Sequence, residues 1–191
     1  MYHFFAMLSR MKHIDRWGLM RCTDKENLSE HSLEVAVIAH ALCTLGNVRF
    51  SKNLDAERAA VVALFHDTGE IITGDMPTPI KYDNEKIRSA YKEIENSASE
   101  KLLSLLPSDI RPEYESIYFE NDEYINKIVK AADKMSALIK CIEELKAGNG
   151  EFKTAEREIR KKLCEMKIPE VDIFMEEFLP SYALTLDEQR A

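Results

Sequence analysis

The chain has 191 residues, of which 45% are apolar and 31% charged, and its formal net charge is -8. This composition is typical of a soluble globular protein, and the length suits one domain with a sizeable core. The acidic balance excludes a general nucleic-acid or anionic-membrane binder, because neutralising phosphates requires an excess of Lys and Arg. No apolar run reaches the roughly 18 residues of a membrane-spanning helix, so we expect neither secretion nor membrane insertion.

The first predicted helix covers residues 1–14 and carries its apolar side chains on one face, at Phe4, Phe5, Leu8 and Met11. The second begins after Asn27 or Ser29, with Glu30 as the partner in a capping box, and ends at residues 46–47. His31 shares the apolar stripe of this second helix with Val35, Ile38 and Leu42. We therefore expect its imidazole to point into the core.

A third predicted helix is capped by Asp55 and ends in the motif His66-Asp67-Thr68-Gly69-Glu70. Helical spacing puts one imidazole and two carboxylates at the same helix end. Such a group can supply part of a metal coordination sphere, with a nearby carboxylate that handles the proton of a bound water. The alternative is an ordinary helix end at which these side chains face solvent.

Residues 72–79 contain two prolines and a glycine, and we expect a stiff loop there, which serves either as a lid beside the site or as a plain connector. Helical periodicity resumes at residues 84–105, weakly at 109–119, and strongly at 122–145. Asp133 interrupts the apolar stripe of the last of these helices. A buried carboxylate needs a cation or hydrogen-bond donors, so Asp133 becomes a third contributor to the candidate site.

Two amphipathic helices close the chain, around Phe152 to Ile159 and around Val171 to Phe178. No segment shows sustained alternation of apolar and polar residues, so the sequence predicts an all-α protein with a single domain over residues 1–191. Within it, residues 27–147 would form the core around the site, and residues 151–180 would pack on that core. Four scattered cysteines without a CxxC pair indicate reduced thiols, and hence the cytoplasm.

Three predicted helices thus offer His31, the His66-Asp67 pair and Asp133. Two imidazoles and two carboxylates suit one divalent first-row metal, and they leave coordination positions for water and a substrate oxygen. A phosphate beside this metal would need further cations, for which Arg16 and Lys81 are candidates.

The order and context of these residues resemble the HD-domain superfamily of metal-dependent phosphohydrolases. The resemblance is closest to the bacterial YfbR-like 5'-deoxynucleotidase family. It covers nearly the whole chain and includes Leu8-Ser9-Arg10, Arg16-Trp17, Ser29-Glu30-His31-Ser32, His66-Asp67, Glu70, Thr73-Gly74-Asp75, Pro77-Thr78-Pro79, Lys81, Ala132-Asp133 and Glu143-Glu144-Leu145. Together these motifs are much more specific than the isolated histidine and aspartate positions.

The resemblance implies an HD-domain helical bundle that hydrolyses deoxyribonucleoside 5'-monophosphates to a deoxynucleoside and inorganic phosphate. It implies that one divalent metal (Mn, Co, Zn or Mg) is bound by His31, His66, Asp67 and Asp133. Asp67 and Glu70 would be catalytic, with Glu70 serving the attacking water or the leaving group. The residues implied to bind substrate are Arg16 at the phosphate, Trp17 and Asp75 at the sugar, Thr78 and Lys81 around the nucleotide, and Glu120, with Glu123 as the alternative to Glu120.

The resemblance also implies a homodimer, with no nucleic-acid or membrane partner. Two other interpretations remain open. Another HD-type hydrolase, a deoxynucleoside triphosphohydrolase or a phosphodiesterase, would share the metal ligands but should carry more basic residues around its phosphates. A non-catalytic nucleotide-binding protein would keep the fold and lose turnover. Taken alone, Trp17 is more often a packing residue, and Glu143-Glu144 is expected to be a solvated helix face.

Overall fold

The computed structural model describes residues 1–81 and 83–190, apart from the side chain of Thr78. In these residues the only extended pairing is an isolated bridge between Asp15 and Asn27, so the predicted all-α class is confirmed. The α-helices are α1 (Phe4–Leu8), α2 (Leu28–Phe50), α3 (Ala56–Phe65), α4 (Glu70–Thr73), α5 (Thr78–Lys81), α6 (Glu85–Leu103), α7 (Arg111–Tyr118), α8 (Glu123–Lys146), α9 (Lys153–Glu165) and α10 (Pro169–Ile173). Short 3-10 helices cover Ser9–His13, Gly150–Phe152, Leu179–Ala183 and Glu188–Arg190, and Phe174–Phe178 is a π-helical turn.

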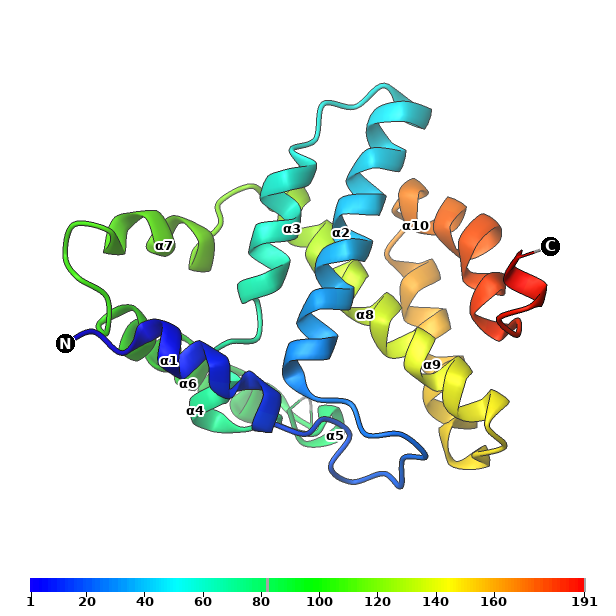
Figure 1. The fold of residues 1–191 in the computed structure, drawn as a ribbon, viewed down its shortest axis with the longest axis horizontal. Coiled ribbons are helices and arrows are strands. Elements are labelled where there is room, and N and C mark those ends of the chain that lie inside the picture. The colour runs from blue at the N-terminus through cyan, green and yellow to red at the C-terminus, as the bar shows by residue number, and fades with distance from the viewer. Residues whose placement is uncertain (82, 191) are drawn as a thin grey trace.

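The main core lies where α2, α3 and α8 pack together (Figure 1). The predicted capping box starts α2: the Asn27 side chain accepts the N–H groups of Ser29 and Glu30, and the Glu30 carboxylate accepts the N–H of Asn27. At α3 and α8 the side chains of Asp55 and Asp122 accept backbone N–H groups of the first turn, without the return bond of a capping box. These caps satisfy N–H groups that have no partner inside the helix, and they fix the starting points of three helices that carry the candidate ligands.

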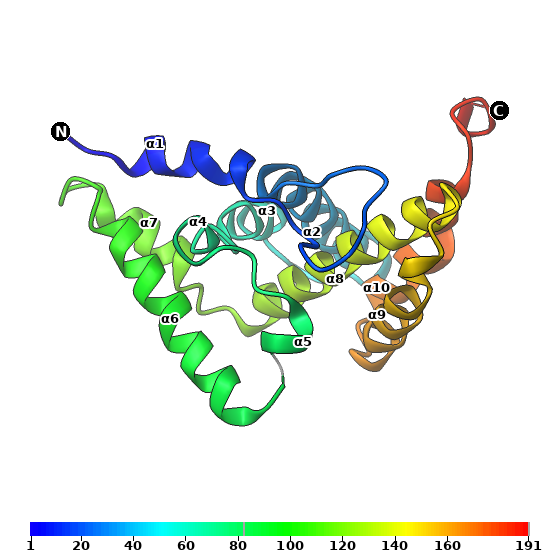
Figure 2. The same cartoon turned by 90° about the horizontal axis from the view of Figure 1, so that it is seen from below.

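The remaining helices flank this core on two sides (Figure 2). On one side, α1, α6 and α7 surround a smaller apolar cluster built on Phe4, Leu102, Leu103 and Leu106. On the other side, α9 and α10 pack against α8 and α2. The short helices α4 and α5 lie between α6 and the core, directly after the His66-Asp67 motif.

α2 extends one turn beyond the predicted end at residues 46–47, to Phe50, where Ser51 adopts the left-handed conformation with φ 54°. Gly46 is not a stop signal. A Cβ at this position would lie 2.5 Å from the buried carboxylate of Glu170 and 2.9 Å from the Leu54 side chain. Gly46 therefore allows α10 to approach α2 closely, a role that sequence does not distinguish from a helix end.

Two further predictions need correction. Phe5 does not share the buried face of α1 with Phe4, since 58% of its surface is exposed. Residues 72–79 are not wholly irregular, because α4 includes Ile72 and Thr73 and α5 begins at Thr78. Pro79 is compatible with α5 because the first turn of a helix does not use the N–H group that proline lacks.

The segment from Asp15 to Asn27, here called the strap, crosses the end of the core and is anchored on α8. The Glu144 carboxylate accepts the backbone N–H groups of Thr23 and Asp24 and the side-chain amide of Asn149. Lys140 forms an ion pair with Glu144 at 2.8 Å and donates to the carbonyl of Asp24. Glu144 is 2% exposed, so the prediction of a solvated Glu143-Glu144 face is wrong for Glu144 and holds for Glu143 only.

Within the described residues, α2 alone is long and apolar enough to cross a membrane, judged by length and composition. Its inward face, which includes Val35, Ile38 and Leu42, is buried in the core. This is the apolar character of a central helix in a bundle.

Candidate metal and phosphate site

Three helices bring the four predicted metal ligands together. His31 lies on the first turn of α2, His66 and Asp67 follow α3, and Asp133 lies near the middle of α8. One ligand atom from each residue lies within 4.8 Å of all the others. Nε2 of His31 is 3.4 Å from Oδ1 of Asp133, and Nε2 of His66 is 3.0 Å from Oδ2 of Asp67. The set predicted from sequence therefore converges on one point.

A second layer of side chains sets the orientation of His31. Its Nδ1 lies 3.0 Å from Oγ of Ser136, and that hydroxyl donates to the Glu34 carboxylate at 2.6 Å. Because the Ser136 proton is committed to Glu34, the serine oxygen accepts the Nδ1–H of His31. Nε2 of His31 then presents a lone pair toward the carboxylates, as a metal ligand must.

His66 is oriented by the backbone. Its Nδ1 donates to the carbonyl oxygen of Ala63 at 2.7 Å, one turn earlier, so its Nε2 also faces the carboxylates. The Nε2 atoms of His31 and His66 are both buried, and neither has a hydrogen-bond partner among the described residues. Two buried nitrogens aimed at two carboxylates fit a divalent cation with mixed nitrogen and oxygen ligands.

The charges of the cluster also favour a bound cation. Burial raises the pKa of Asp133, but the imidazoles of His31 and His66 lower it by more, to about 2. Burial lowers the pKa of His66, whereas the carboxylates of Asp67 and Asp133 raise it by more, to about 9. The pKa of Asp67 is held well below its usual range by the same imidazoles, against the effect of burial. Two ionised carboxylates in one buried site favour a positive charge between them, which a proton on the His66 imidazole supplies until a divalent cation displaces it.

Arg16 lies beside this cluster on the strap. Its Nη1 is 3.5 Å from Oδ2 of Asp67, and its Nε donates to Glu26 at 3.2 Å. Among the described residues these are the polar contacts of its side chain, so further N–H donors of the guanidinium are available to a ligand. A planar guanidinium next to a metal cluster is suited to hold two oxygens of a phosphate.

Glu70 begins α4 and is buried, with 6% of its surface exposed. Its Oε2 has no hydrogen-bond partner among the described residues. Burial and the negative charges of Asp67 and Asp75 raise the pKa of Glu70 to about 9, against the opposing charges of Arg16 and Lys81. A raised pKa favours the protonated form of this carboxyl group and suits it to donate a proton as a general acid.

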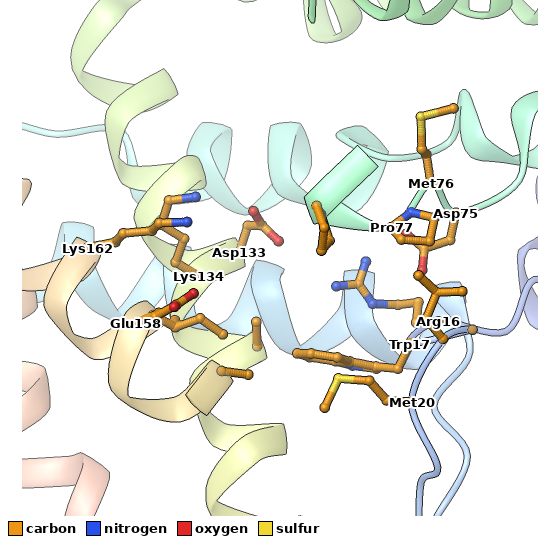
Figure 3. A pocket seen from close by; sticks show the side chains of 16 residues that line it. Arg16, Trp17, Met20, Asp75, Met76, Pro77, Asp133, Lys134, Glu158 and Lys162 are labelled. Atoms are coloured by element: carbon orange, nitrogen blue, oxygen red, sulfur yellow. The ribbon is translucent and has the colours of Figure 1, made fainter. Parts of the chain in front are cut away.

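Two cavities meet at the cluster of metal-ligand candidates, and Asp133 lines both. The first has a volume of about 470 Å³ and is lined by Arg16, Trp17 and Asp75, by the loop at Met76 and Pro77, and by residues of α8 and α9. Figure 3 shows Arg16 and Trp17 on one side of this cavity, with Lys134, Glu158 and Lys162 opposite. The second has a volume of about 340 Å³ and is lined by His66, Asp67, Glu70, Lys81 and Glu120, among others.

Comparison with known proteins shows which family the chain belongs to. It matches the family described as "5'-deoxynucleotidase YfbR-like" over residues 3–182. The chain belongs to this family. It is 50% identical to a 5'-deoxynucleotidase of Erwinia tasmaniensis over 97% of its own length and 95% of the relative's. It is 49% identical to a 5'-deoxynucleotidase of Yersinia pestis, with 98% and 96% covered.

Solved structures show the same fold at lower identity. An HD-domain phosphohydrolase from Listeria innocua superimposes with a TM-score of 0.83 at 24% identity, covering 99% of this chain and 92% of the other. The cyanophage S-2L HD phosphohydrolase DatZ, solved with dA and one catalytic Zn²⁺ ion, gives 0.68 at 22% identity, with 94% and 96% covered. The fold of this YfbR-like chain is therefore that of the HD-domain phosphohydrolases.

The structure separates the predicted substrate residues of this family member into two groups. Arg16, Trp17 and Asp75 line the first cavity. Lys81 and Glu120 line the second, where Lys81 pairs with Glu95 at 2.5 Å and Glu120 pairs with Arg58 at 2.5 Å. The side chain of Thr78 lies outside the described part of the structure. Glu123, the alternative to Glu120, is exposed on the first turn of α8 and is not among the residues that line the second cavity.

Sequence reasoning missed the residues that support the predicted ones. Glu34 and Ser136 lie three positions after His31 and Asp133, so helical spacing alone would have placed them beside the ligands. Lys134, next to Asp133 on α8, also faces the first cavity. The α9 residues Glu158 and Lys162 face it too, but only the packing of α9 on α8 brings them there. Glu26 contacts both Arg16 and Trp17 from the far end of the strap, and no periodic pattern signals that contact.

Proposed function

We propose that this YfbR-like protein is a metal-dependent 5'-deoxynucleotidase, which hydrolyses deoxyribonucleoside 5'-monophosphates to the deoxynucleoside and inorganic phosphate. The observation that carries the proposal is the convergence of four metal-ligand candidates beside Arg16, at the edge of a cavity of about 470 Å³. The names of the relatives at about half identity support the same activity. DatZ, which shares the fold, binds a deoxynucleoside together with one Zn²⁺ ion.

His31, His66, Asp67 and Asp133 would hold one divalent ion, with Mn, Co, Zn and Mg as candidates. When bound, such an ion lowers the pKa of a water molecule and withdraws charge from a phosphoryl oxygen. Asp67 is positioned to ligate the ion and to orient Arg16, since its Oδ2 faces Nε2 of both histidines and Nη1 of Arg16.

The remaining roles follow from position. Arg16 binds the 5'-phosphate, and Trp17 with Asp75 contacts the sugar from the wall of the same cavity. An added 2'-hydroxyl must either fit against the indole or find a hydrogen-bond partner, and a site that offers neither disfavours ribose. Glu70 donates a proton to the leaving oxygen or accepts one from the attacking water. Lys81 and Glu120 complete the nucleotide site from the side of the second cavity, and Thr78 belongs to the same proposed set.

One observation favours the triphosphohydrolase alternative. Lys134 and Lys162 face the first cavity opposite Arg16, so this chain places more basic groups around the cavity than Arg16 and Lys81 alone (Figure 3). These lysines can contact either a base or further phosphates. The product released from dATP decides, because a triphosphohydrolase releases triphosphate whereas a monophosphatase leaves dATP intact.

The test is phosphate release from dAMP, AMP and dATP by metal-stripped protein with each of the four metals restored. His66→Ala and Glu70→Ala should lose release, whereas His40→Ala and Glu93→Ala, at exposed positions, should keep it. Release from dAMP well above AMP supports the proposal. Release from neither monophosphate with any metal rejects it, and triphosphate from dATP then establishes the alternative. A protein that binds dAMP without any turnover would be the non-catalytic alternative.

The cytoplasmic location, the single domain and the homodimer belong to the same proposal, as does the absence of nucleic-acid and membrane partners. Sedimentation velocity at micromolar concentration tests the oligomeric state directly, with a mass near twice 22.0 kDa expected for a dimer.

A further inference from the structure

Glu26 joins the two residues that face the phosphate and the sugar in the proposed function. Its Oε2 accepts the Nε–H of Arg16 at 3.2 Å and the Nε1–H of Trp17 at 2.8 Å. Its backbone carbonyl also accepts the N–H of Arg16 at 2.9 Å. The side chains of Glu26 and Arg16 are each only 11% exposed, so the contacts are made in a largely dehydrated environment.

We propose that Glu26 is a positioning residue that holds Arg16 and Trp17 as one unit, so that phosphate binding and sugar selection depend on the same carboxylate. The inference rests on the proposed function for its consequences in turnover. Glu26 is not one of the four metal-ligand candidates, and it is not among the residues that line either cavity at the cluster. It therefore acts through Arg16 and Trp17.

The backbone of Trp17 explains why such a partner is needed. Its φ is 61°, in the left-handed region that bulky residues rarely adopt. The strained residue is held at its side chain, by the hydrogen bond to Glu26 and by the ring of Phe152 at 5.2 Å between centroids. If the carboxylate is removed, the indole N–H loses its partner, and the strap can relax toward an unstrained conformation that moves the ring.

Two different carboxylates hold the guanidinium of Arg16, one at each edge. The Nε edge is fixed by Glu26, and Nη1 is fixed by Asp67 at 3.5 Å. Without Glu26, Arg16 keeps only the carboxylate that faces both histidines, so the guanidinium is drawn toward the metal cluster and away from the cavity. A bidentate contact requires that two N–H groups of the guanidinium point at the phosphate. Turning the guanidinium away from the cavity therefore weakens phosphate binding.

Two substitutions separate the two contacts. In Glu26→Gln the amide oxygen still accepts the indole N–H, but the charge that attracts Arg16 is lost. In Glu26→Ala both contacts are lost. We expect Glu26→Gln to raise KM for dAMP about tenfold, the loss of one charge-assisted contact, while the preference for dAMP over AMP stays close to wild type. We expect Glu26→Ala to lose both the affinity and most of the preference.

Trp17 is the only tryptophan in the chain, so its fluorescence reports on this one residue. In metal-stripped protein without nucleotide, Glu26→Ala should increase the quenching of this fluorescence by acrylamide, and Glu26→Gln should not. Glu151→Ala is the matched control, because Glu151 pairs with the strap at the exposed Arg21, 3.6 Å away, and does not contact Trp17. A thermal unfolding midpoint for each variant verifies that the fold is retained.

The experiment is steady-state kinetics on dAMP and AMP for wild type and the three variants, combined with this quenching series. The proposal is supported when Glu26→Ala loses sugar preference and exposes Trp17, while Glu26→Gln and Glu151→Ala keep both properties. Wild-type quenching and sugar preference in a folded Glu26→Ala protein overturn it. If wild type hydrolyses no nucleotide, the proposed function fails separately, and the quenching series alone decides whether Glu26 positions Trp17.

Discussion

Oδ2 of Asp67 lies 3.0 Å from Nε2 of His66, its neighbour in the chain. The same oxygen lies 3.6 Å from Nε2 of His31 and 3.5 Å from Nη1 of Arg16. One carboxylate oxygen thus connects the metal-ligand candidates to the phosphate-binding candidate. A change in the charge or position of this oxygen should therefore alter both metal binding and substrate binding.

Metal removal should lower stability as well as activity. The four metal-ligand candidates lie on or directly after three helices of the core, so a bound ion would hold these helices together. A ligand at a hundred times its dissociation constant stabilises a folded protein by about 2.7 kcal/mol. For a chain of this size that energy raises the unfolding midpoint by about 5–10 °C. The measurement is a thermal scan of metal-stripped protein with Mn, Co, Zn or Mg added. His66→Ala should show no metal-dependent shift, and an identical midpoint with and without every metal would contradict the assignment of the cluster.

Arg16→Lys should be strongly deleterious although it keeps the charge. Lys cannot contact Glu26 and Asp67 from one planar group and present further donors to a phosphate. A charge-assisted hydrogen bond contributes about 1.5–3 kcal/mol, so we expect kcat/KM for dAMP to fall roughly 10-fold to 100-fold. The control is Arg21→Lys on the same strap, whose side chain is 96% exposed, and it should behave as wild type.

Ser136→Ala should weaken metal binding without touching a ligand. The substitution removes the acceptor of His31 Nδ1–H and leaves Glu34 without its donor. Loss of such a supporting contact typically reduces metal affinity by about 10-fold to 100-fold. Metal titration followed by the thermal midpoint measures the change. Ser97→Ala, at an exposed position of α6, provides the control, and equal affinities in both variants would show that Ser136 does not orient His31.

Glu144→Gln should destabilise the protein in a pH-dependent way. Although burial raises the pKa of Glu144, its contacts with Lys140, Thr23 and Asn149 lower it to about 2. A lowered pKa in the folded state means that the carboxylate contributes stability fully above the unfolded-state pKa, about 4.5, and that this contribution is lost as the pH falls toward 2. Urea unfolding should therefore separate wild type from Glu144→Gln at pH 7, and the difference should shrink as the pH falls from about 4.5 toward 2.

The exposed neighbour Glu143 provides the control for this experiment. Glu143→Gln should unfold close to wild type throughout the same pH range, because its side chain does not hold the strap. A constant difference between wild type and Glu144→Gln from pH 7 to pH 3 would show that the ionised carboxylate is not the source of the stability.

Glu120→Gln and Glu123→Gln test which acid belongs to the site. Glu120 lines the second cavity, whereas Glu123 is exposed at the start of α8. We expect Glu120→Gln to lower kcat/KM for dAMP, and Glu123→Gln to leave it unchanged. Because Glu120 also pairs with Arg58, the unfolding midpoint of both variants must be measured, and a lower rate without a lower midpoint assigns Glu120 to the site.

Helical periodicity made the convergence of the four metal-ligand candidates predictable. His31 and Asp133 are polar residues on otherwise apolar stripes, and His66 ends a third such stripe, so each stands out against the core it belongs to. The capping residues Asn27 and Asp55 were predictable for a similar reason, since their partners lie within one turn. Local rules therefore predicted the helices and the positions of the metal-ligand candidates that converge in the structure.

The strap was not predictable in the same way. Trp17 combines a left-handed φ with side-chain contacts to Glu26 and Phe152, which lie nine or more residues away in sequence and which no helical spacing predicts. Glu144 follows Lys140 by four residues and so reads as an exposed helical ion pair, but its partners also include backbone N–H groups of the strap. Glycine at position 46 reads as a helix end for the same reason, because its contact, Glu170, lies on another helix.

Asp133, Ser136, Lys140 and Glu144 form a single polar stripe along about three turns of α8, from the metal-ligand candidate to the anchor of the strap. Since each residue turns an α-helix by about 100°, one inserted or deleted residue inside this stretch would rotate everything after it away from its partners. Glu144 would then leave the strap even if every side chain were retained. The length of this segment is thus as constrained as its sequence.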